Sequence, residues 1–133
     1  MKKIGILLAS LLLATTVFAA QKGAFFANIT SSSIHKATMA TKMSFMFQKD
    51  GHATTVFLND QGVMIGAKTH KEYAKAQNNL KKFIKQGGTV LVCPMCLKYY
   101  NVDPKDLIDG AQIANHQAVE AAIFAPNTTA LSW

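Results

Sequence analysis

Thr89-Val90-Leu91-Val92-Cys93-Pro94-Met95-Cys96-Leu97-Lys98 is the stretch that decides the fold of this chain. Its first four residues are β-branched or apolar and follow Gly87-Gly88, a pattern that is typical of a buried strand. Pro94 suits the first position of a helix, because proline lacks an N–H that would have no partner there. The stretch therefore predicts a buried strand that runs directly into a short helix, with Cys93 at the helix N-cap.

The same alternation of strand and helix extends along the chain in both directions. Strands are expected over residues 24–30, 53–58, 89–92, 111–113 and 128–133. Helices are expected between them, over residues 34–49, 69–86 and 115–124, with shorter helical turns after Cys93 and from Asp103. This order predicts an α/β domain with a doubly wound, mostly parallel five-stranded sheet and helices on both faces. Reactive sites in such folds lie beyond the carboxyl ends of the strands, where Cys93 falls.

Two helices carry more detailed predictions. On a helical wheel, the first helix places one apolar stripe toward the core, made of Met39, Ala40, Met43, Met46 and Phe47. Phe45 falls on the opposite side, among Thr38, Thr41, Lys42, Ser44 and Lys49, so we expect another copy of the chain to bury it. The second helix is expected to begin with the capping box Thr69-His70-Lys71-Glu72. Its predicted core face is Tyr73, Ala76, Leu80, Phe83 and Ile84.

The first residues have the three-part pattern of a secretory signal peptide. Met1-Lys2-Lys3 precedes an uncharged run that ends at Ala20, and Val17-Phe18-Ala19 offers small residues before a cut. The alternative is an uncleaved anchor, because the run approaches the ~20 residues that span a bilayer. We expect a cleaved signal at residues 1–19 and a single mature domain over residues 22–133. The protein is then exported to a bacterial periplasm, without stable membrane insertion after cleavage.

The charge pattern argues against nucleic acid as a partner. The chain has a net charge of +7, and every basic residue in it is a lysine. Proteins that read nucleic acids rely on the bidentate guanidinium of arginine, which this sequence lacks. The lysines are also dispersed, so they are expected to form an ordinary solvated surface.

Cys93 and Cys96 are the only cysteines of the chain. A disulfide between them would close a very small loop and would restrain the unfolded chain little, which disfavours a purely structural role. Backbone N–H groups at a helix start favour the thiolate of Cys93, the form that attacks sulfur, carbon or metal. Dithiol redox chemistry is therefore one reading, although a thioredoxin fold is disfavoured because the pair follows the third main strand.

Metal binding is the other reading of the cysteine pair. Two thiolates with Met95 between them suit a soft ion such as Cu(I), with Cys93, Cys96 and Met95 as its ligands. Zinc is disfavoured, because the chain has no second cysteine pair and its histidines are scattered singly. No glycine-rich phosphate loop is present either, and no cofactor is expected.

Several stretches in order resemble one known family. They are the first strand with His35-Lys36-Ala37, then residues 50–58 with Gly62-Val63, residues 88–93, residues 106–110 and the closing residues 130–133. Their order and spacing resemble the DsrE/DsrF-like sulfur-relay family. The resemblance implies a flavodoxin-like domain that assembles into trimers or hexamers. It also implies a cysteine that accepts sulfur as a persulfide and passes it on, and Cys93 matches that position.

The first functional expectation is an exported sulfur-handling or thiol-redox protein, in which Cys93 is the catalytic nucleophile and Cys96 the resolving thiol. It would carry out persulfide transfer or dithiol/disulfide exchange with a sulfur donor or a thiol protein partner, as a homo-oligomer. Whether it is a sulfurtransferase or a sulfur carrier stays open. The alternative is a non-enzymatic module that binds Cu(I) or a protein partner.

Overall fold

A single parallel sheet organises the described part of the chain. The structure is a computed structural model that describes residues 22–133, so the predicted signal peptide at residues 1–19 lies outside the described residues. The strands are β1 (Phe25–Ile29), β2 (Thr54–Leu58), β3 (Thr89–Val92), β4 (Gln112–Ile113) and β5 (Thr129–Ser132). They lie in the order β4-β3-β2-β1-β5, and every pair is parallel. The predicted α/β class is confirmed.

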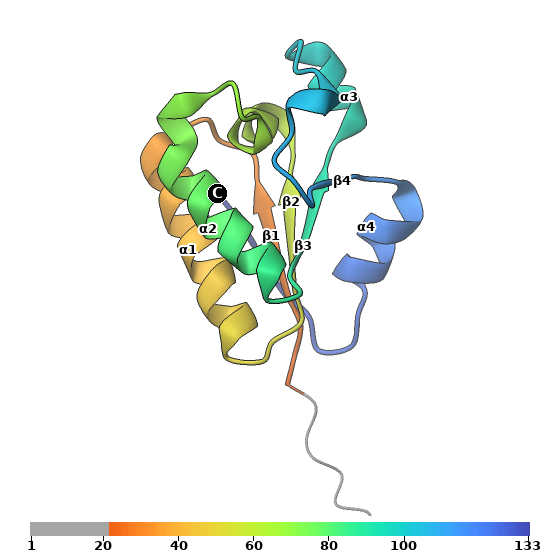
Figure 1. Cartoon of the computed structure of the whole chain (residues 1–133). Coiled ribbons are helices and arrows are strands. Elements are labelled where there is room, and N and C mark those ends of the chain that lie inside the picture. Colours follow the sequence, from red (N-terminus) through yellow and green to blue (C-terminus); the bar gives the residue numbers. More distant parts are fainter. Residues whose placement is uncertain (1–21) are drawn as a thin grey trace, which may run out of the picture.

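Helices cover both faces of this sheet, as predicted. α1 (Ile34–Lys49) and α2 (Ala74–Lys85) lie side by side on one face, and α4 (His116–Ile123) lies on the other (Figure 1). Right-handed crossovers explain why α1 and α2 share one face and α4 lies on the other. The chain adds β2, β3 and β4 in one direction and then returns across the sheet to β5. This strand order differs from the 2-1-3-4-5 order of flavodoxin itself, although the layers are the same.

Shorter elements gather at the carboxyl ends of the strands. α3 (Pro94–Tyr99) follows β3 directly, and the 3-10 segments η1 (Asp60–Gly66) and η3 (Pro104–Asp106) lie near it (Figure 1). η1 packs very closely on the end of β1, where a side chain at Gly62 would overlap the carbonyl oxygen of Ile29. This end of the sheet therefore brings together the segments that follow β2 and β3, beside the end of β1.

The main core lies between the sheet and the pair α1 and α2. Alternate strand positions point toward these helices, as the two-residue period of a strand requires. Its fully buried strand residues include Ala27, Ile29, Val56, Leu58, Val90 and Val92. The opposite face is covered less completely, because neither α4 nor β5 contains a buried residue.

The bounds of α1 are as expected, and its predicted core face is confirmed for Ala40, which is buried, and for Phe47, which packs against the core, but it is wrong for Met39 and Met46. Its buried residues are Ala37, Ala40, Thr41 and Ser44, whereas Met39 and Met46 are about half exposed. Thr41 and Ser44 donate their hydroxyls to the carbonyls of Ala37 and Ala40, both at 2.8 Å, which removes the cost of burying them. Small side chains on this face let α1 lie close to the sheet and to α2.

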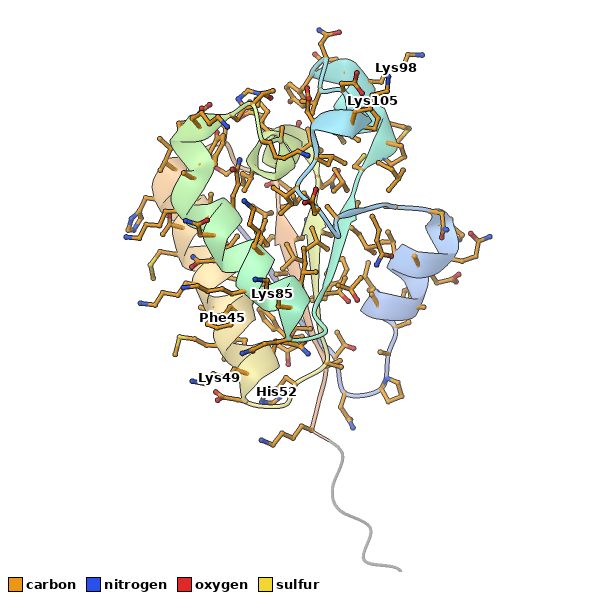
Figure 2. The ribbon with its side chains drawn as sticks, in the orientation of Figure 1. Phe45, Lys49, His52, Lys85, Lys98 and Lys105 are labelled. Atoms are coloured by element: carbon orange, nitrogen blue, oxygen red, sulfur yellow. The ribbon has the colours of Figure 1, made fainter. Side chains whose placement is uncertain are left out.

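Phe45 is consequently not an isolated aromatic ring on a polar face. It is half-buried and packs against the core of the same chain (Figure 2). Its position therefore gives no independent sign of a contact with another copy.

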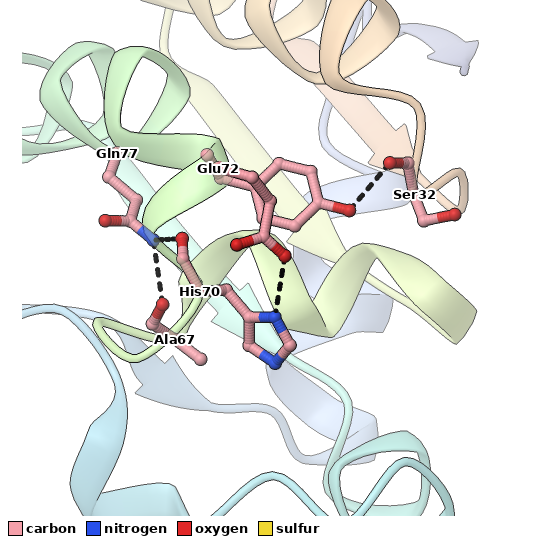
Figure 3. A network of polar contacts seen from close by, with 6 residues as sticks. Ser32, Ala67, His70, Glu72 and Gln77 are labelled. Atoms are coloured by element: carbon pink, nitrogen blue, oxygen red, sulfur yellow. Dashed lines mark hydrogen bonds and ion pairs between the residues drawn. The ribbon is translucent and has the colours of Figure 1, made fainter.

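The start of α2 also differs from the prediction. The segment η2 (Lys71–Tyr73) precedes the helix, and Glu72 pairs with His70 Nδ1 at 3.0 Å instead of closing a capping box (Figure 3). The buried Tyr73 donates its hydroxyl to the carbonyl of Ser32 at 2.6 Å. Gln77 donates to the carbonyl of Ala67 at 2.8 Å and fixes the same turn (Figure 3). The predicted core face is otherwise confirmed, with Tyr73, Ala76, Leu80 and Phe83 buried.

The helices of residues 22–133 are all too short or too polar to cross a membrane.

Candidate functional site

Cys93 lies where β3 becomes α3. Its backbone N–H donates to the carbonyl of Leu58 at the end of the neighbouring strand, at 3.0 Å. Its φ and ψ of −65° and 116° are extended, and Pro94 takes the first helical position after it. Its sulfur accepts the backbone N–H of Cys96 at 3.3 Å, so Cys93 is the N-cap residue, as the sequence predicts.

The two cysteine sulfurs face each other. Cys93 Sγ and Cys96 Sγ lie 2.6 Å apart, and both residues are free cysteines. Cys93 is only 6% exposed, while Cys96 is half-buried and forms the more accessible side of the pair. The arrangement is a dithiol that needs little movement to form a bond between its sulfurs.

The end of β2 supplies further contacts to Cys96. Asn59 Oδ1 lies 3.2 Å from Cys96 Sγ, where it can accept the thiol proton. The backbone N–H of Asp60 points at the same sulfur from 3.2 Å and also reaches Asn59 Oδ1 at 2.9 Å. Tyr100, the residue after α3, donates its hydroxyl to Asp60 Oδ1 at 2.5 Å.

These contacts set the protonation preferences of the site. Burial raises the pKa of the Cys96 thiol, its hydrogen bond to Cys93 raises it further, and the Asp60 N–H opposes both effects. Cys93 Sγ accepts the backbone N–H of Cys96, and the single proton of the Cys96 thiol has two acceptors within reach, Cys93 Sγ at 2.6 Å and Asn59 Oδ1 at 3.2 Å. The bond to the Asp60 carboxylate raises the pKa of Tyr100 to about 12, which keeps its hydroxyl protonated.

A shallow hollow of about 360 Å³ opens beside the dithiol. It is lined by Asp60, Met95, Cys96, Tyr99 and Tyr100, so it gives access to Cys96. Met95 and Tyr99 are each 79% exposed at its rim. Another cavity, of about 230 Å³ and lined by Phe25, Phe47 and His52 among others, contains neither cysteine. His52 marks the end of the molecule opposite Lys98 and Lys105, which lie near α3 (Figure 2). The hollow at Cys96 is therefore the candidate site.

The sequence and the fold both match known proteins. Residues 13–125 match the DsrE/DsrF-like family, which is most of the chain. This protein belongs to the DsrE/DsrF-like family.

Two solved structures show the same fold as this DsrE/DsrF-like chain. The crystal structure of ychN protein from E. coli superposes with a TM-score of 0.69 at 19% identity, covering 85% of this chain and 99% of that one. The protein of unknown function MTH1491 from Methanobacterium thermoautotrophicum gives a TM-score of 0.69 at 13% identity, covering 84% and 100%. Identities this low establish a shared fold and no more. No curated protein matches the chain in sequence.

The sequence analysis of this DsrE/DsrF-like protein named Cys93, Cys96 and Met95, and the structure places all three at the candidate site. Cys96 and Met95 line the same hollow, while Cys93 lies behind Cys96. Within residues 22–133, no group of three or more His, Cys, Asp and Glu side chains could hold a metal ion together.

Sequence reasoning missed Asn59, Asp60 and Tyr100. Two signals could have identified them. Asn59-Asp60 directly follows the strand next to β3, and the carboxyl ends of neighbouring parallel strands meet at one edge. Tyr100 lies four residues after Cys96, the spacing that places two side chains on one face of a helix.

Proposed function

We propose that this protein handles reduced sulfur through the Cys93–Cys96 dithiol, by persulfide transfer or by dithiol/disulfide exchange. Cys93 acts as the nucleophile and Cys96 as the resolving thiol. The observation that carries this proposal is the 2.6 Å approach of the two sulfurs, with both hydrogen-bond donors of Cys96 directed at Cys93. Membership of the DsrE/DsrF-like family supports a role in sulfur relay.

The proposed chemistry uses a sulfur donor of the form R–S–S⁻ or a polysulfide. The Cys93 thiolate attacks the outer sulfur of the donor, the S–S bond breaks, and R–S⁻ leaves with the electron pair of that bond. An acceptor thiolate then takes the outer sulfur from the Cys93 persulfide and regenerates the thiolate. In the competing outcome, Cys96 loses its proton and attacks the inner sulfur, which forms the Cys93–Cys96 disulfide and releases HS⁻.

The small exposure of Cys93 limits which sulfur donors can reach its sulfur. At 6% exposure, its sulfur is accessible only to a slender group that approaches past Cys96. An inorganic polysulfide or the persulfide at the tip of a partner's flexible side chain fits this restriction. The test is an intact mass of the reduced protein after incubation with polysulfide.

The expected product in that experiment is protein that carries one or more additional sulfur atoms, or that has lost two hydrogens to a disulfide. Cys93→Ser should prevent both changes, because the nucleophile is gone. Cys96→Ser should accumulate the persulfide on Cys93, because no resolving thiol remains. Unmodified wild-type protein, or full sulfur loading of Cys93→Ser, would contradict the assignment.

A second candidate function is binding of a soft metal such as Cu(I). It is favoured by one observation: Met95 and Cys96 line the same hollow, with Cys93 Sγ directly behind. Two thiolates and a thioether are soft ligands that suit Cu(I). Metal analysis of protein purified under reducing conditions distinguishes the candidates, since stoichiometric copper that is lost in Cys93→Ser would favour binding.

We also propose that the mature protein works after export, in the periplasm, as a homo-oligomer. The signal-like pattern of residues 1–19 supports export. Amino-terminal sequencing of the protein recovered from the periplasmic fraction tests it. A first residue near Ala20 is the expected result, and an intact Met1 in the cytoplasmic fraction would contradict it.

A further inference from the structure

Asp60 contacts two residues of the α3 region, one through its backbone and the other through its side chain. Its backbone N–H points at Cys96 Sγ from 3.2 Å, and its carboxylate accepts the Tyr100 hydroxyl at 2.5 Å. Cys96 and Tyr100 are one helical turn apart, so both contacts come from the same side of that helix. The end of β2 is thereby joined to α3 at two points.

The backbone of Asp60 has an uncommon conformation. Its φ of 48° lies in the left-handed region, which residues other than glycine adopt uncommonly and which aspartate and asparagine tolerate best. The direction of the Asp60 N–H depends on this local conformation. Asn59 Oδ1 adds a third contact, because it accepts the Asp60 N–H and lies 3.2 Å from Cys96 Sγ.

We propose that Tyr100 is a positioning residue for the dithiol, which holds the Asn59–Asp60 turn against Cys96 through the Asp60 carboxylate. This inference rests on the proposed function of the Cys93–Cys96 pair. Tyr100 does not touch the sulfur in these contacts and acts on it through Asp60. The high pKa of Tyr100, about 12, means that its hydroxyl donates to Asp60 throughout the physiological range.

The contacts of Asn59 and Asp60 with Cys96, together with the Tyr100–Asp60 hydrogen bond, are called the clamp here. The clamp favours the reduced form of the Cys93–Cys96 pair. In the dithiol, Asn59 Oδ1 is one of the two acceptors within reach of the Cys96 thiol proton, and the Asp60 N–H points at the Cys96 sulfur, which carries negative charge when it is ionised. A disulfide has neither the proton nor the charge, so both contacts lose strength on oxidation. Loss of the clamp should therefore shift the pair toward the disulfide.

The test is the exchange equilibrium with glutathione. One glutathione disulfide takes two electrons from the dithiol, so that the Cys93–Cys96 bond forms, the glutathione S–S bond breaks, and two glutathione thiols leave with the protons. Tyr100→Phe keeps the ring and removes only the hydroxyl. It should shift the equilibrium constant about threefold to tenfold toward the disulfide, where tenfold corresponds to about 29.6 mV.

Tyr73→Phe is the matched control, because the Tyr73 hydroxyl also donates a hydrogen bond, to the carbonyl of Ser32, and Tyr73 does not line the hollow at Cys96. It loses the same atom and should leave the constant within about twofold of wild type. Equal constants for Tyr100→Phe and Tyr73→Phe would overturn the proposal.

A double-mutant cycle separates positioning through Asp60 from a general structural effect of the hydroxyl. Asp60→Gly removes the acceptor and tolerates the positive φ of this position, and in that background Tyr100→Phe should change the exchange constant no further. An additive effect of the two substitutions would overturn the proposed route through Asp60. If Tyr100→Phe fails to fold, Asp60→Gly still tests the clamp, because Asp60→Gly alone must shift the constant toward the disulfide while Tyr73→Phe must not.

This equilibrium needs only the two thiols and glutathione. A protein that takes no sulfur from polysulfide would lose the proposed relay function, whereas the exchange constants would still decide the role of Tyr100.

Discussion

Cys96 directs both its backbone N–H and its thiol toward the sulfur of Cys93, at 3.3 and 2.6 Å. Burial and the contact with Cys93 raise the pKa of the Cys96 thiol, so the more accessible cysteine of the pair is the one held back from ionising. In the proposed function, Cys93 receives the transferred sulfur at the buried position, and Cys96 must lose its proton before it can attack the product.

Asn59 should control how readily Cys96 reacts. Asn59→Asp would place a carboxylate near Cys96 Sγ, where Asn59 Oδ1 now lies 3.2 Å away. A nearby negative charge disfavours the thiolate, so the pKa of Cys96 should rise further above its usual range. Alkylation of Cys96 by iodoacetamide near pH 8 should slow about threefold to tenfold, as followed by mass mapping of the modified cysteine.

The control for that experiment is Asn101→Asp, which adds the same charge at an exposed position after α3. Equal rates for Asn59→Asp and Asn101→Asp would mean that general charge, and not the contact with Cys96, governs the reaction.

The ionisation of Tyr100 should depend on Asp60. The carboxylate accepts the phenol proton, which stabilises the protonated form and raises the pKa of Tyr100 to about 12. Asp60→Asn removes the negative charge, so this pKa should fall toward the ordinary value of about 10. Carbon NMR of proteins with labelled tyrosine rings measures the change. Asp109→Asn removes an acid whose side chain is 99% exposed, and a comparable fall in that variant would contradict the assignment.

Gly62 should be essential to the placement of η1. A Cβ atom there would lie 1.9 Å from the carbonyl oxygen of Ile29, a backbone atom that cannot move aside without displacing β1. Gly62→Ala should therefore lower the free energy of unfolding by at least about 2 kcal/mol, measured by urea denaturation. The exposed neighbour Gln61 provides the control, since Gln61→Ala should cost well under half of that amount.

The sequence predicted the dithiol junction well because its signals are local. A β-branched run, a proline and two cysteines lie within ten residues, and each acts through the backbone beside it. The contacts from Asn59 and Asp60 were missed because they join positions 36 and 37 residues apart in the chain. They follow from the parallel pairing of β2 with β3, which places the ends of both strands at one edge.

Met39 and Met46 of α1 were wrongly assigned to the core, and the reason differs from the one that hid the contacts of Asn59 and Asp60. A helical wheel ranks residues by hydrophobicity, which favoured the methionines. Close packing of α1 instead selected small side chains, and Thr41 and Ser44 could be buried because their hydroxyls bond to carbonyls of their own helix. Hydrophobicity alone contains no information about how closely two helices approach.

Assembly gives the last prediction. We propose that α4, rather than Phe45, contributes to contacts between copies, because α4 has no buried residue and Phe124, which ends it, is 79% exposed. Single exposed apolar side chains are common on monomers, so Phe124 supports this proposal only together with Ile123 and Leu131, which are exposed as well, at 37% and 45%. Light scattering of residues 22–133 at micromolar concentration should give the mass of three or six chains, and Phe124→Ser should shift it toward one chain. Phe45→Ser should leave the mass unchanged and lower the melting temperature instead, because Phe45 packs against the core of its own chain. A wild-type mass of one chain would refute the oligomer, and an intact oligomer in Phe124→Ser would place its interface elsewhere.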